Sequence, residues 1–518
     1  MTEQRSDATS ARAVTARFST GLGAVVLVVL VLLTYGPSVF GGFLIYDDGW
    51  LYQNNPLLAP DAVRTPLLAF SDFSRETRLV LGAEYLPLRD VLAWLETRTF
   101  GLWAPGLHAT SVLLYLAAAL FFRGALLRCL GAGLGTEFSA LLFALHPVHA
   151  ESVAWLAGQK DVLALIFVGA ALYVHAGEQR HRTWLVPLLV VAASLAKSMS
   201  VAVLGLLLAQ DLWLRRRLNR ALYLGCCAGV VATMAAHVYV GRVVGMVAEP
   251  LGGSRYHALI SMGPVWLRYL MASLAPWTLS ITHDVPVRST WDLPAVLGMA
   301  AVVGSIAYAV VAMKRGRRAP AFLVLWFFAP LLPVSQVLVP LQNRMADRYL
   351  WLSVMAPCIV FGWLLEGALA RRSSAWPKLL AGVVLLLVAN ATLSRVLLFT
   401  DNMLLFADGM QKTTVDTIAP YQLGQALELE GKDAEAILAY REAVRRGTLA
   451  LDPRLPSASN NLARLLARRG QLAEAEQVLR DGLARFPDNP KMRKNLAKML
   501  HQTQRHREAE EFDATPPR

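Results

Sequence analysis

Long runs of apolar residues, separated by short polar loops, dominate the first 400 residues of the chain. A run of about 20 apolar residues is long enough for a helix to cross the hydrocarbon core of a bilayer. The pattern predicts eleven spans: residues 21–40, 106–122, 136–145, 162–176, 184–196, 201–214, 221–240, 293–313, 321–339, 350–369 and 379–398. The first run is longer than the apolar core of a signal peptide, so we expect an uncleaved helix after a cytoplasmic segment, residues 1–20.

The basic residues orient this array of spans. Three strongly basic loops, Arg215–Arg217, Lys314–Arg318 and Arg371–Lys378, fall on the same side as the N-terminus. The positive-inside rule places that side in the cytoplasm and the C-terminal tail outside. Residues 258–274 are also apolar, but counting them as a span would move the loop Lys314–Arg318 outside. We therefore predict an interfacial or re-entrant element there.

Composition supports the membrane class. The 518 residues are 55% hydrophobic and only 17% charged, where a soluble protein would carry about a quarter charged residues. The net charge of +13 could indicate nucleic-acid binding, but the basic residues lie in short loops between apolar runs. That pattern orients a protein in the bilayer, so we expect no nucleic-acid partner. The four cysteines lie in or beside apolar segments and show neither disulfide-framework nor metal spacing.

The sequence becomes polar and charged after residue 400, and a repeat of 34 residues appears. Six residues recur at this spacing: Pro456, Asn461, Leu462, Ala463, Leu466 and Ala475 return as Pro490, Asn495, Leu496, Ala497, Leu500 and Ala509. This period is typical of tetratricopeptide repeats, which are helical hairpins that stack into a solenoid. We predict two to three repeats in residues 417–511, with a concave face able to hold a peptide. An all-helical tail with accidental similarity is the alternative.

Two adjacent acids, Asp47 and Asp48, follow the first predicted span and begin the outer loop, residues 41–105. Carboxylates this close to hydrocarbon are costly, which favours a function over a simple cap of the loop. One carboxylate can act as a general base, and the second can orient it or hold a metal.

Further polar residues are expected at the same outer boundary. The candidates for binding a substrate are Arg89, His146, His149, Glu151, Lys160, Lys197 and Arg348. Cations there suit a phosphate leaving group, as in sugar transfer from a polyprenyl phosphate. Each has a structural alternative: the histidines can satisfy backbone groups, Lys197 can extend to the interface, and Arg348 can anchor a helix. His146, His149 and Glu151 could also hold a divalent cation, although their spacing is loose. No cofactor is identified.

Several short motifs carry a family resemblance when taken in order. They are Tyr46-Asp47-Asp48, Tyr85-Leu86-Pro87-Leu88, His146-Pro147-Val148-His149-Ala150-Glu151, Lys160-Asp161, Leu195-Ala196-Lys197 and Asp347-Arg348-Tyr349-Leu350. With the repeat tail, the chain resembles the transmembrane-and-tetratricopeptide O-mannosyltransferases, which belong to the GT-C class of membrane glycosyltransferases. The resemblance implies an all-α GT-C domain over residues 21–400, a lipid-phosphate sugar as donor, and Asp47 and Asp48 as the acidic motif. Leu86, Gln159 and Ser198 depart from the family pattern.

The sequence therefore predicts a glycosyltransferase that moves a sugar, mannose by the resemblance, from a polyprenyl phosphate to a hydroxyl on the outer face of a bacterial-type inner membrane. The predicted acceptor is a protein Ser or Thr presented by the repeat tail. With a glycan or glycolipid acceptor, deleting the tail would leave activity nearly intact. With a non-enzymatic membrane-anchored scaffold, replacing Asp47 would have no effect. A transporter is disfavoured because charge pairs within the spans are scarce.

Overall fold

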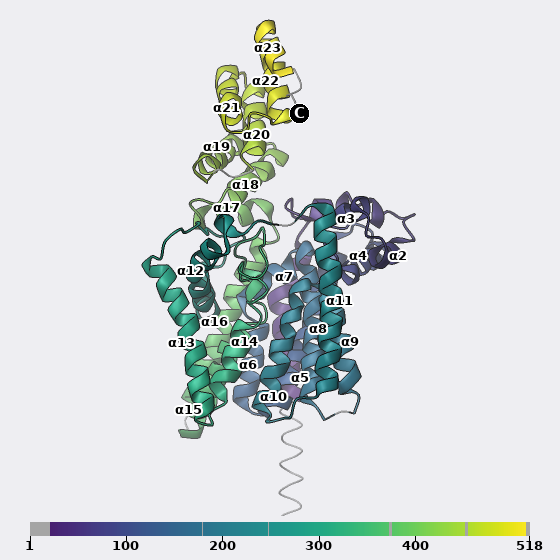
Figure 1. The fold of residues 1–518 in the computed structure, drawn as a ribbon, viewed down its shortest axis with the longest axis vertical. Coiled ribbons are helices and arrows are strands. Elements are labelled where there is room, and N and C mark those ends of the chain that lie inside the picture. The colour runs from purple at the N-terminus through teal and green to yellow at the C-terminus, as the bar shows by residue number, and fades with distance from the viewer. Residues whose placement is uncertain (1–20, 179, 247, 372–374, 451–453, 514–518) are drawn as a thin grey trace, which may run out of the picture. The chain divides into compact units, whose positions relative to one another are not determined.

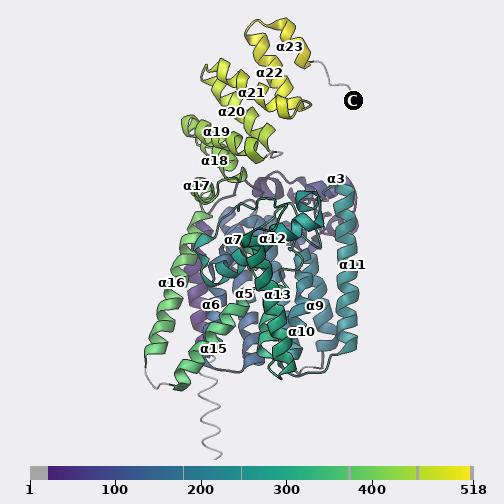
Figure 2. The same cartoon turned by 60° about the vertical axis from the view of Figure 1, so that its left-hand side comes forward.

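A computed structural model of the chain describes residues 21–178, 180–246, 248–371, 375–450 and 454–513. These residues form helices joined by loops, without a strand among them (Figures 1 and 2). The predicted cytoplasmic segment, residues 1–20, lies outside this described part. Contacts divide the chain into two compact units. The first unit runs to Leu279 and resumes over Val285–Thr400, and the second comprises Ser280–Asp284 and the chain from Asp401 onward.

Six helices of the first unit are long and apolar enough to cross a membrane. They are Gly21–Phe40, α5 (Ala104–Leu130), Leu156–Ala176, which contains α8 (Gln159–Ala176), α11 (Arg220–Val244), α13 (Leu293–Lys314) and α16 (Trp376–Leu398). Helix α8 packs against α5 on one side and against α9 (Arg182–Ala196) on the other, and α9 in turn packs against α11. These four helices make one wall of the unit (Figure 1). We call the end where residues 41–105 lie the outer end, following the orientation predicted from the basic loops.

The remaining five predicted spans coincide with shorter helices. These are α6 (Leu134–Ala144), α9, α10 (Val203–Trp213), α14 (Ala319–Phe328) and α15 (Met355–Arg371). The predicted ninth span, residues 321–339, is wrong in its second half because the helix ends at Phe328. Pro330 and Pro333 follow, and proline lacks the N–H that a helix interior needs. The segment expected to be interfacial or re-entrant forms α12 (Arg255–Leu274), which is not one of the six long apolar helices.

At two helix crossings, a pair of glycines lets the two backbones come into contact. Gly135 of α6 faces Gly362 of α15, and Gly263 of α12 faces Gly298 of α13. A methyl group added to Gly135, Gly362 or Gly298 would overlap the backbone of its partner, and one added to Gly263 would overlap the backbone of Ala295, also in α13. Membrane helices pack closely through such small residues because lipid supplies no hydrophobic force to join them.

The outer loop is a folded element. It contains η2 (Gly49–Gln53), η3 (Pro56–Leu58), α2 (Thr65–Ser71), α3 (Arg75–Val80) and α4 (Pro87–Phe100). Arg78 is fully buried and joins these pieces, donating to the carbonyl oxygens of Asp72, Leu68 and Ala69. An arginine used in this way fixes the loop as a scaffold, so residues at both of its ends can be positioned for chemistry.

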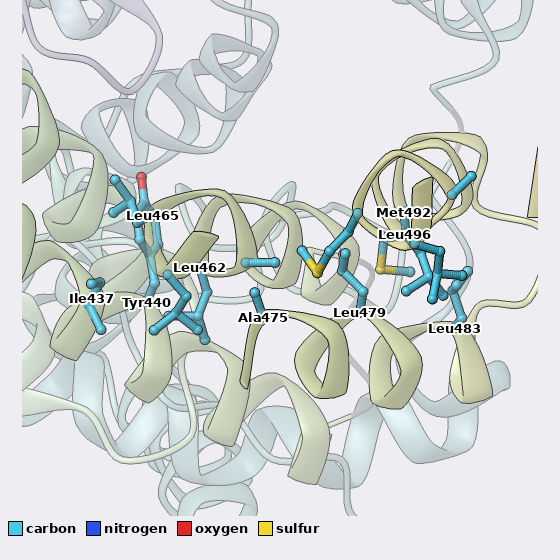
Figure 3. Packing of buried hydrophobic residues seen from close by; sticks show 14 of the residues in the cluster. Ile437, Tyr440, Leu462, Leu465, Ala475, Leu479, Leu483, Met492 and Leu496 are labelled. Atoms are coloured by element: carbon cyan, nitrogen blue, oxygen red, sulfur yellow. The ribbon is translucent and has the colours of Figure 1, made fainter. Parts of the chain in front are cut away.

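The second unit begins with α17 (Asn402–Lys412) and continues as three helical hairpins. The hairpin helices are α18 (Ile418–Leu429), α19 (Asp433–Ala450), α20 (Leu455–Arg468), α21 (Leu472–Arg485), α22 (Pro490–Gln502) and α23 (His506–Asp513). Figure 3 shows the core between them, along which the buried side chains of Tyr440, Leu462, Leu479 and Leu496 are spread. Gly424 allows the Tyr440 ring to approach, because a Cβ there would lie 2.6 Å from it.

A short segment from the loop between α12 and α13 is built into this second unit. Asp284 accepts hydrogen bonds from the backbone N–H groups of Thr414, Val415 and Asp416, at 2.7, 3.1 and 2.8 Å, and from the Thr414 hydroxyl at 2.9 Å. These donors oppose the effect of burial and lower the pKa of the Asp284 carboxyl. The charge stays on this side chain, so it caps the turn that leads into α18.

The hairpin turns yield a stability prediction. Gly431 and Gly470 have φ of +72° and +78°, and Gln504, which lies 34 residues after Gly470, has φ of +63°. A side chain in this left-handed region costs about 1–2 kcal/mol, partly offset by the extra chain entropy of glycine. We expect Gln504→Gly to stabilise the tail by about 0.5–1 kcal/mol, measured by urea unfolding of the full chain in detergent. The reciprocal Gly470→Gln should destabilise it; equal midpoints for both variants would contradict the prediction.

Candidate active site

Asp48 holds the outer loop against the segment that follows η4 (Pro147–His149). Its side chain is fully buried, and its two oxygens accept hydrogen bonds from the N–H groups of Leu44 and Ala157, each at 2.9 Å. Burial raises the pKa of Asp48 to about 7, despite these two donors. Both oxygens are thus occupied, and Asp48 is in a position to fix the loop that carries its neighbour.

Asp47 is in a different position. It is half-buried, and the described residues give its carboxylate neither a hydrogen bond nor an ion pair. Partial burial raises the pKa of Asp47, and the nearby cations Lys160 and Arg348 oppose this rise. A carboxylate that is partly shielded from water and still open to a ligand has the properties of a general base. The structure thereby separates the two acids of the sequence pair.

Glu84 joins two of the predicted cations, although the sequence did not single it out. Its Oε2 lies 2.5 Å from the Lys160 Nζ and 3.2 Å from the Arg89 Nη1. Burial opposes ionisation, but Lys160, Arg89 and Lys197 together hold the pKa of Glu84 well below its usual value. The position of Glu84, directly before the motif that starts at Tyr85, was the only available signal. Arg89 also pairs with Asp90, at 2.6 Å.

Arg348 and Glu151 form a buried ion pair between η9 (Asp347–Leu350) and α7 (Ala150–Ala154). Glu151 also accepts a hydrogen bond from the backbone N–H of Arg348, at 3.1 Å. The guanidinium lies over the ring of Trp155, 5.4 Å from its centroid, and Tyr46 stacks on that ring at 5.6 Å. Because Tyr46 precedes Asp47, this stack ties the acidic pair to the arginine.

Lys197 completes the group of cations. It ends α9, is almost fully buried, and lies 2.7 Å from the Asp161 carboxylate at the start of α8. Burial lowers the pKa of Lys197 to about 8, and Asp161 opposes this effect. Lys197 is also close enough to Lys160, Arg348 and Glu84 to be affected by their charges. The fold therefore brings four predicted cations from four segments together, and three of them, Lys160, Arg348 and Arg89, are close enough to Asp47 to affect its carboxylate.

The two histidines have packing roles beside this group, since η4 contacts η9, which carries Arg348. His146 accepts a hydrogen bond from the N–H of Val148, at 3.3 Å, and so caps η4. His149 is fully buried against the rings of Phe143 and Tyr115. Among the described residues, no three His, Cys, Asp or Glu side chains are placed so that they could hold a metal ion. The hypothesis of a metal on His146, His149 and Glu151 thus has no support in the geometry.

A series of hydrogen bonds between buried polar side chains supports the site. The Tyr52 hydroxyl donates to Gln159 Oε1 at 3.1 Å, and Gln159 Nε2 donates to Glu96 Oε1 at 2.6 Å. These residues link the outer loop, α8 and α4, and α4 is packed through its polar side chains Arg89, Asp90 and Glu96 as well as through its apolar ones. Gln159, where the family pattern has a different residue, is part of this support and precedes Lys160.

Comparison with known proteins gives two independent findings. A tetratricopeptide repeat family model matches residues 456–499. The curated relatives include the Caenorhabditis elegans protein O-mannosyl-transferase F38B6.6, at 24% identity over 82% of this chain and 63% of the relative. Human protein O-mannosyl-transferase TMTC1 is 26% identical over 84% of this chain and 55% of its own length. Drosophila melanogaster Tmtc3 is 24% identical, over 78% and 53%. No solved structure is a significant match.

These matches confirm the resemblance to the transmembrane-and-tetratricopeptide O-mannosyltransferases, and they extend over most of this chain. The chain spans between about half and two thirds of the length of these relatives. The all-α polytopic fold and the repeat tail are confirmed as well.

Proposed function

We propose that this chain, which resembles the transmembrane-and-tetratricopeptide O-mannosyltransferases, is a membrane glycosyltransferase that takes a sugar from a polyprenyl-phosphate carrier. The proposed sugar is mannose, and the proposed acceptor is a Ser or Thr hydroxyl of a polypeptide on the outer face. The observation that carries the proposal is an open carboxylate, Asp47, beside the cations Lys160 and Arg348 at the outer end of apolar helices.

The reaction requires few groups. The acceptor oxygen attacks the anomeric carbon as its proton passes to Asp47, and the bond from that carbon to the phosphate oxygen breaks. The polyprenyl phosphate leaves with the electron pair, and the cations stabilise its charge. The Lys160–Glu84 pair is more exposed than the Lys197–Asp161 pair, with side chains 18% and 30% accessible. Lys160 can therefore exchange its carboxylate for a phosphate most easily.

An apolar groove in the first unit suits the chain of the carrier. It has a volume of about 240 Å³, and α12, α13, α14 and α15 line it through residues such as Leu270, Val302 and Val360. Tyr269, next to Leu270, bonds through its hydroxyl with the backbone of Ala346, two residues before Arg348. One helix thus contributes to the groove and supports the segment that carries a phosphate candidate, as a donor with an apolar tail and an anionic head requires.

The repeat unit supports a polypeptide acceptor. Stacked helical hairpins have a concave face on which extended peptides bind, and the hairpins here have a closed apolar core of their own (Figure 3). Such a unit is stable without adding its exposed faces to a larger core. Those faces remain available to a partner.

Transfer from radiolabelled polyprenyl-phosphate mannose in membranes that contain the full-length chain tests the proposal. We expect label in the protein fraction, no transfer from GDP-mannose when carrier synthesis is blocked, and release of the label by treatment that cleaves O-linked sugars. Label confined to the lipid or glycan fraction would show that the acceptor is a glycolipid or glycan and not a polypeptide. Equal labelling in membranes that lack the chain would overturn the proposed activity.

A further inference from the structure

A second polar site lies at the opposite ends of the helices from the acidic pair. A cavity of about 510 Å³ opens there, lined by Arg128, Ala176, Gly177, Glu178, Leu214 and Arg216. These residues end α5 and α8 and follow α10, so the cavity marks the boundary where three helices leave the bilayer. Trp213, which donates to the carbonyl oxygen of Cys129 at 3.0 Å, lies beside it, and tryptophan favours the membrane–water interface.

Two arginines of this cavity are held in place without a counter-ion. Arg128 donates to the carbonyl oxygen of Tyr173 at 2.8 Å, and its guanidinium lies over the Tyr173 ring, 3.4 Å from the centroid. Arg216 donates to the carbonyl oxygens of His175 and Ala176, at 2.6 and 2.8 Å. Within the described part of the chain, neither arginine is within ion-pair distance of a carboxylate, Glu178 included. Each guanidinium has five N–H donors, so both keep donors for a ligand.

The backbone is adapted to this arrangement at two points. A Cβ on Gly177 would lie 2.8 Å from Nη1 of Arg128, so glycine leaves room for that guanidinium. Arg215 adopts a φ of +55°, and the Arg216 N–H then bonds to the carbonyl oxygen of Asp211 at 2.9 Å. A left-handed arginine where glycine is the easier choice costs free energy, and it turns Arg216 towards the end of α8.

The surroundings add to the positive charge. Five more arginines occupy the two chain segments that border the cavity: Arg180, Arg182, Arg215, Arg217 and Arg220. A positively charged pocket between helix ends at the bilayer surface attracts anionic lipid head groups. Paired guanidinium groups match the geometry of a phosphate better than ammonium groups do.

We propose that Arg128 and Arg216 bind the phosphate group of an anionic phospholipid between the ends of α5, α8 and α10. A cap on the end of α8 would use the same carbonyl contacts, but it needs neither two unpaired guanidinium groups nor the adjoining cavity. The lipid would join three helices, one of which, α8, carries Lys160 of the proposed active site at its outer end. The lipid site is independent of the proposed function, because none of its residues belongs to that active site.

Native mass spectrometry of the full-length chain in detergent, titrated with phosphatidylglycerol or phosphatidylcholine, tests the assignment. The double variant Arg128→Gln/Arg216→Gln should bind phosphatidylglycerol about tenfold or more weakly, since two charge-assisted contacts are lost. The matched control, Arg217→Gln/Arg220→Gln, removes two charges from the same region without altering the cavity lining and should stay within about twofold of wild type. Equal losses in both double variants, or no preference for phosphatidylglycerol in the wild type, would overturn the proposal.

Two further measurements on the wild-type chain do not depend on how the variants fold. A photoactivatable phosphatidylglycerol should label peptides that contain residues 176–178 and 214–216, and labelling confined to other segments would contradict the site. Glycerol phosphate should displace the lipid only at far higher concentration. Displacement at matching concentrations would assign the site to a soluble phosphate compound and overturn the lipid assignment.

Discussion

Replacing Asp47 with asparagine is expected to reduce kcat for sugar transfer by about 10²–10⁴-fold while leaving KM and thermal stability nearly unchanged. The side chain is half-buried and its carboxylate accepts no hydrogen bond from the described residues, so an amide of the same size fits in its place. Since burial raises the pKa of Asp47, wild-type activity should fall on the acid side with an apparent pKa above the ordinary value of about 3.9 for Asp. Initial rates against donor concentration and pH, in membranes with equal amounts of protein, measure both effects.

Asp48→Asn is the matched control, because it makes the same change one residue away. An amide would place an N–H₂ group against the N–H of Leu44 or Ala157, so one of two buried hydrogen bonds becomes a repulsive contact. We expect a loss of stability of about 1–3 kcal/mol, visible as a lower midpoint in thermal unfolding. A variant at Asp47 that unfolds as early as the one at Asp48, or that keeps full kcat, would remove Asp47 from the chemistry.

Replacing Arg348 with methionine should destabilise the first unit by about 3–5 kcal/mol, because Glu151 would be left buried and unpaired. The combined variant Arg348→Met/Glu151→Gln removes both charges and should recover much of that loss, although transfer activity should stay low because the phosphate contact is missing. Thermal unfolding of the full-length chain in detergent, with transfer measured on the same samples, separates the two effects.

Arg315→Met serves as the control for this experiment. Arg315 is an exposed arginine of the same unit, and its loss should leave both unfolding and transfer unchanged. If the double variant is no more stable than Arg348→Met alone, the stacking of the guanidinium on Trp155 would account for the stabilisation, and the ion pair would not.

The sequence predicted the positions of the apolar helices and of the acidic pair, because hydrophobic length and local motifs are encoded in neighbouring residues. It could not distinguish Asp47 from Asp48, since their difference depends on the N–H of Ala157, which is 109 residues away from Asp48. Glu84 was overlooked for the same reason: its partner Lys160 is 76 residues away. Charge pairing of this kind appears only when the chain is folded.

Composition alone also did not show where a helix ends or how a side chain is oriented. Residues 321–339 are mostly apolar, yet α14 ends at Phe328 because the prolines beyond it cannot continue a helix. For His146 and His149 the sequence left open whether they bind a ligand or satisfy neighbouring groups. The fold uses the first as a helix cap and packs the second between aromatic rings. Spacing along the chain did not show which way either ring faces.

The four hydrogen bonds of Asp284 have a consequence for how this protein can be divided. The repeat unit includes Ser280–Asp284, more than 100 residues before the rest of it, so three chain crossings join the two units. A truncation after Thr400 would leave the Asp284 carboxylate without the N–H groups that donate to it. A chimaera that exchanges only the C-terminal part would place Asp284 against a turn of different sequence. Any graft of the repeat unit must therefore carry Ser280–Asp284 together with the chain from Asp401 onward.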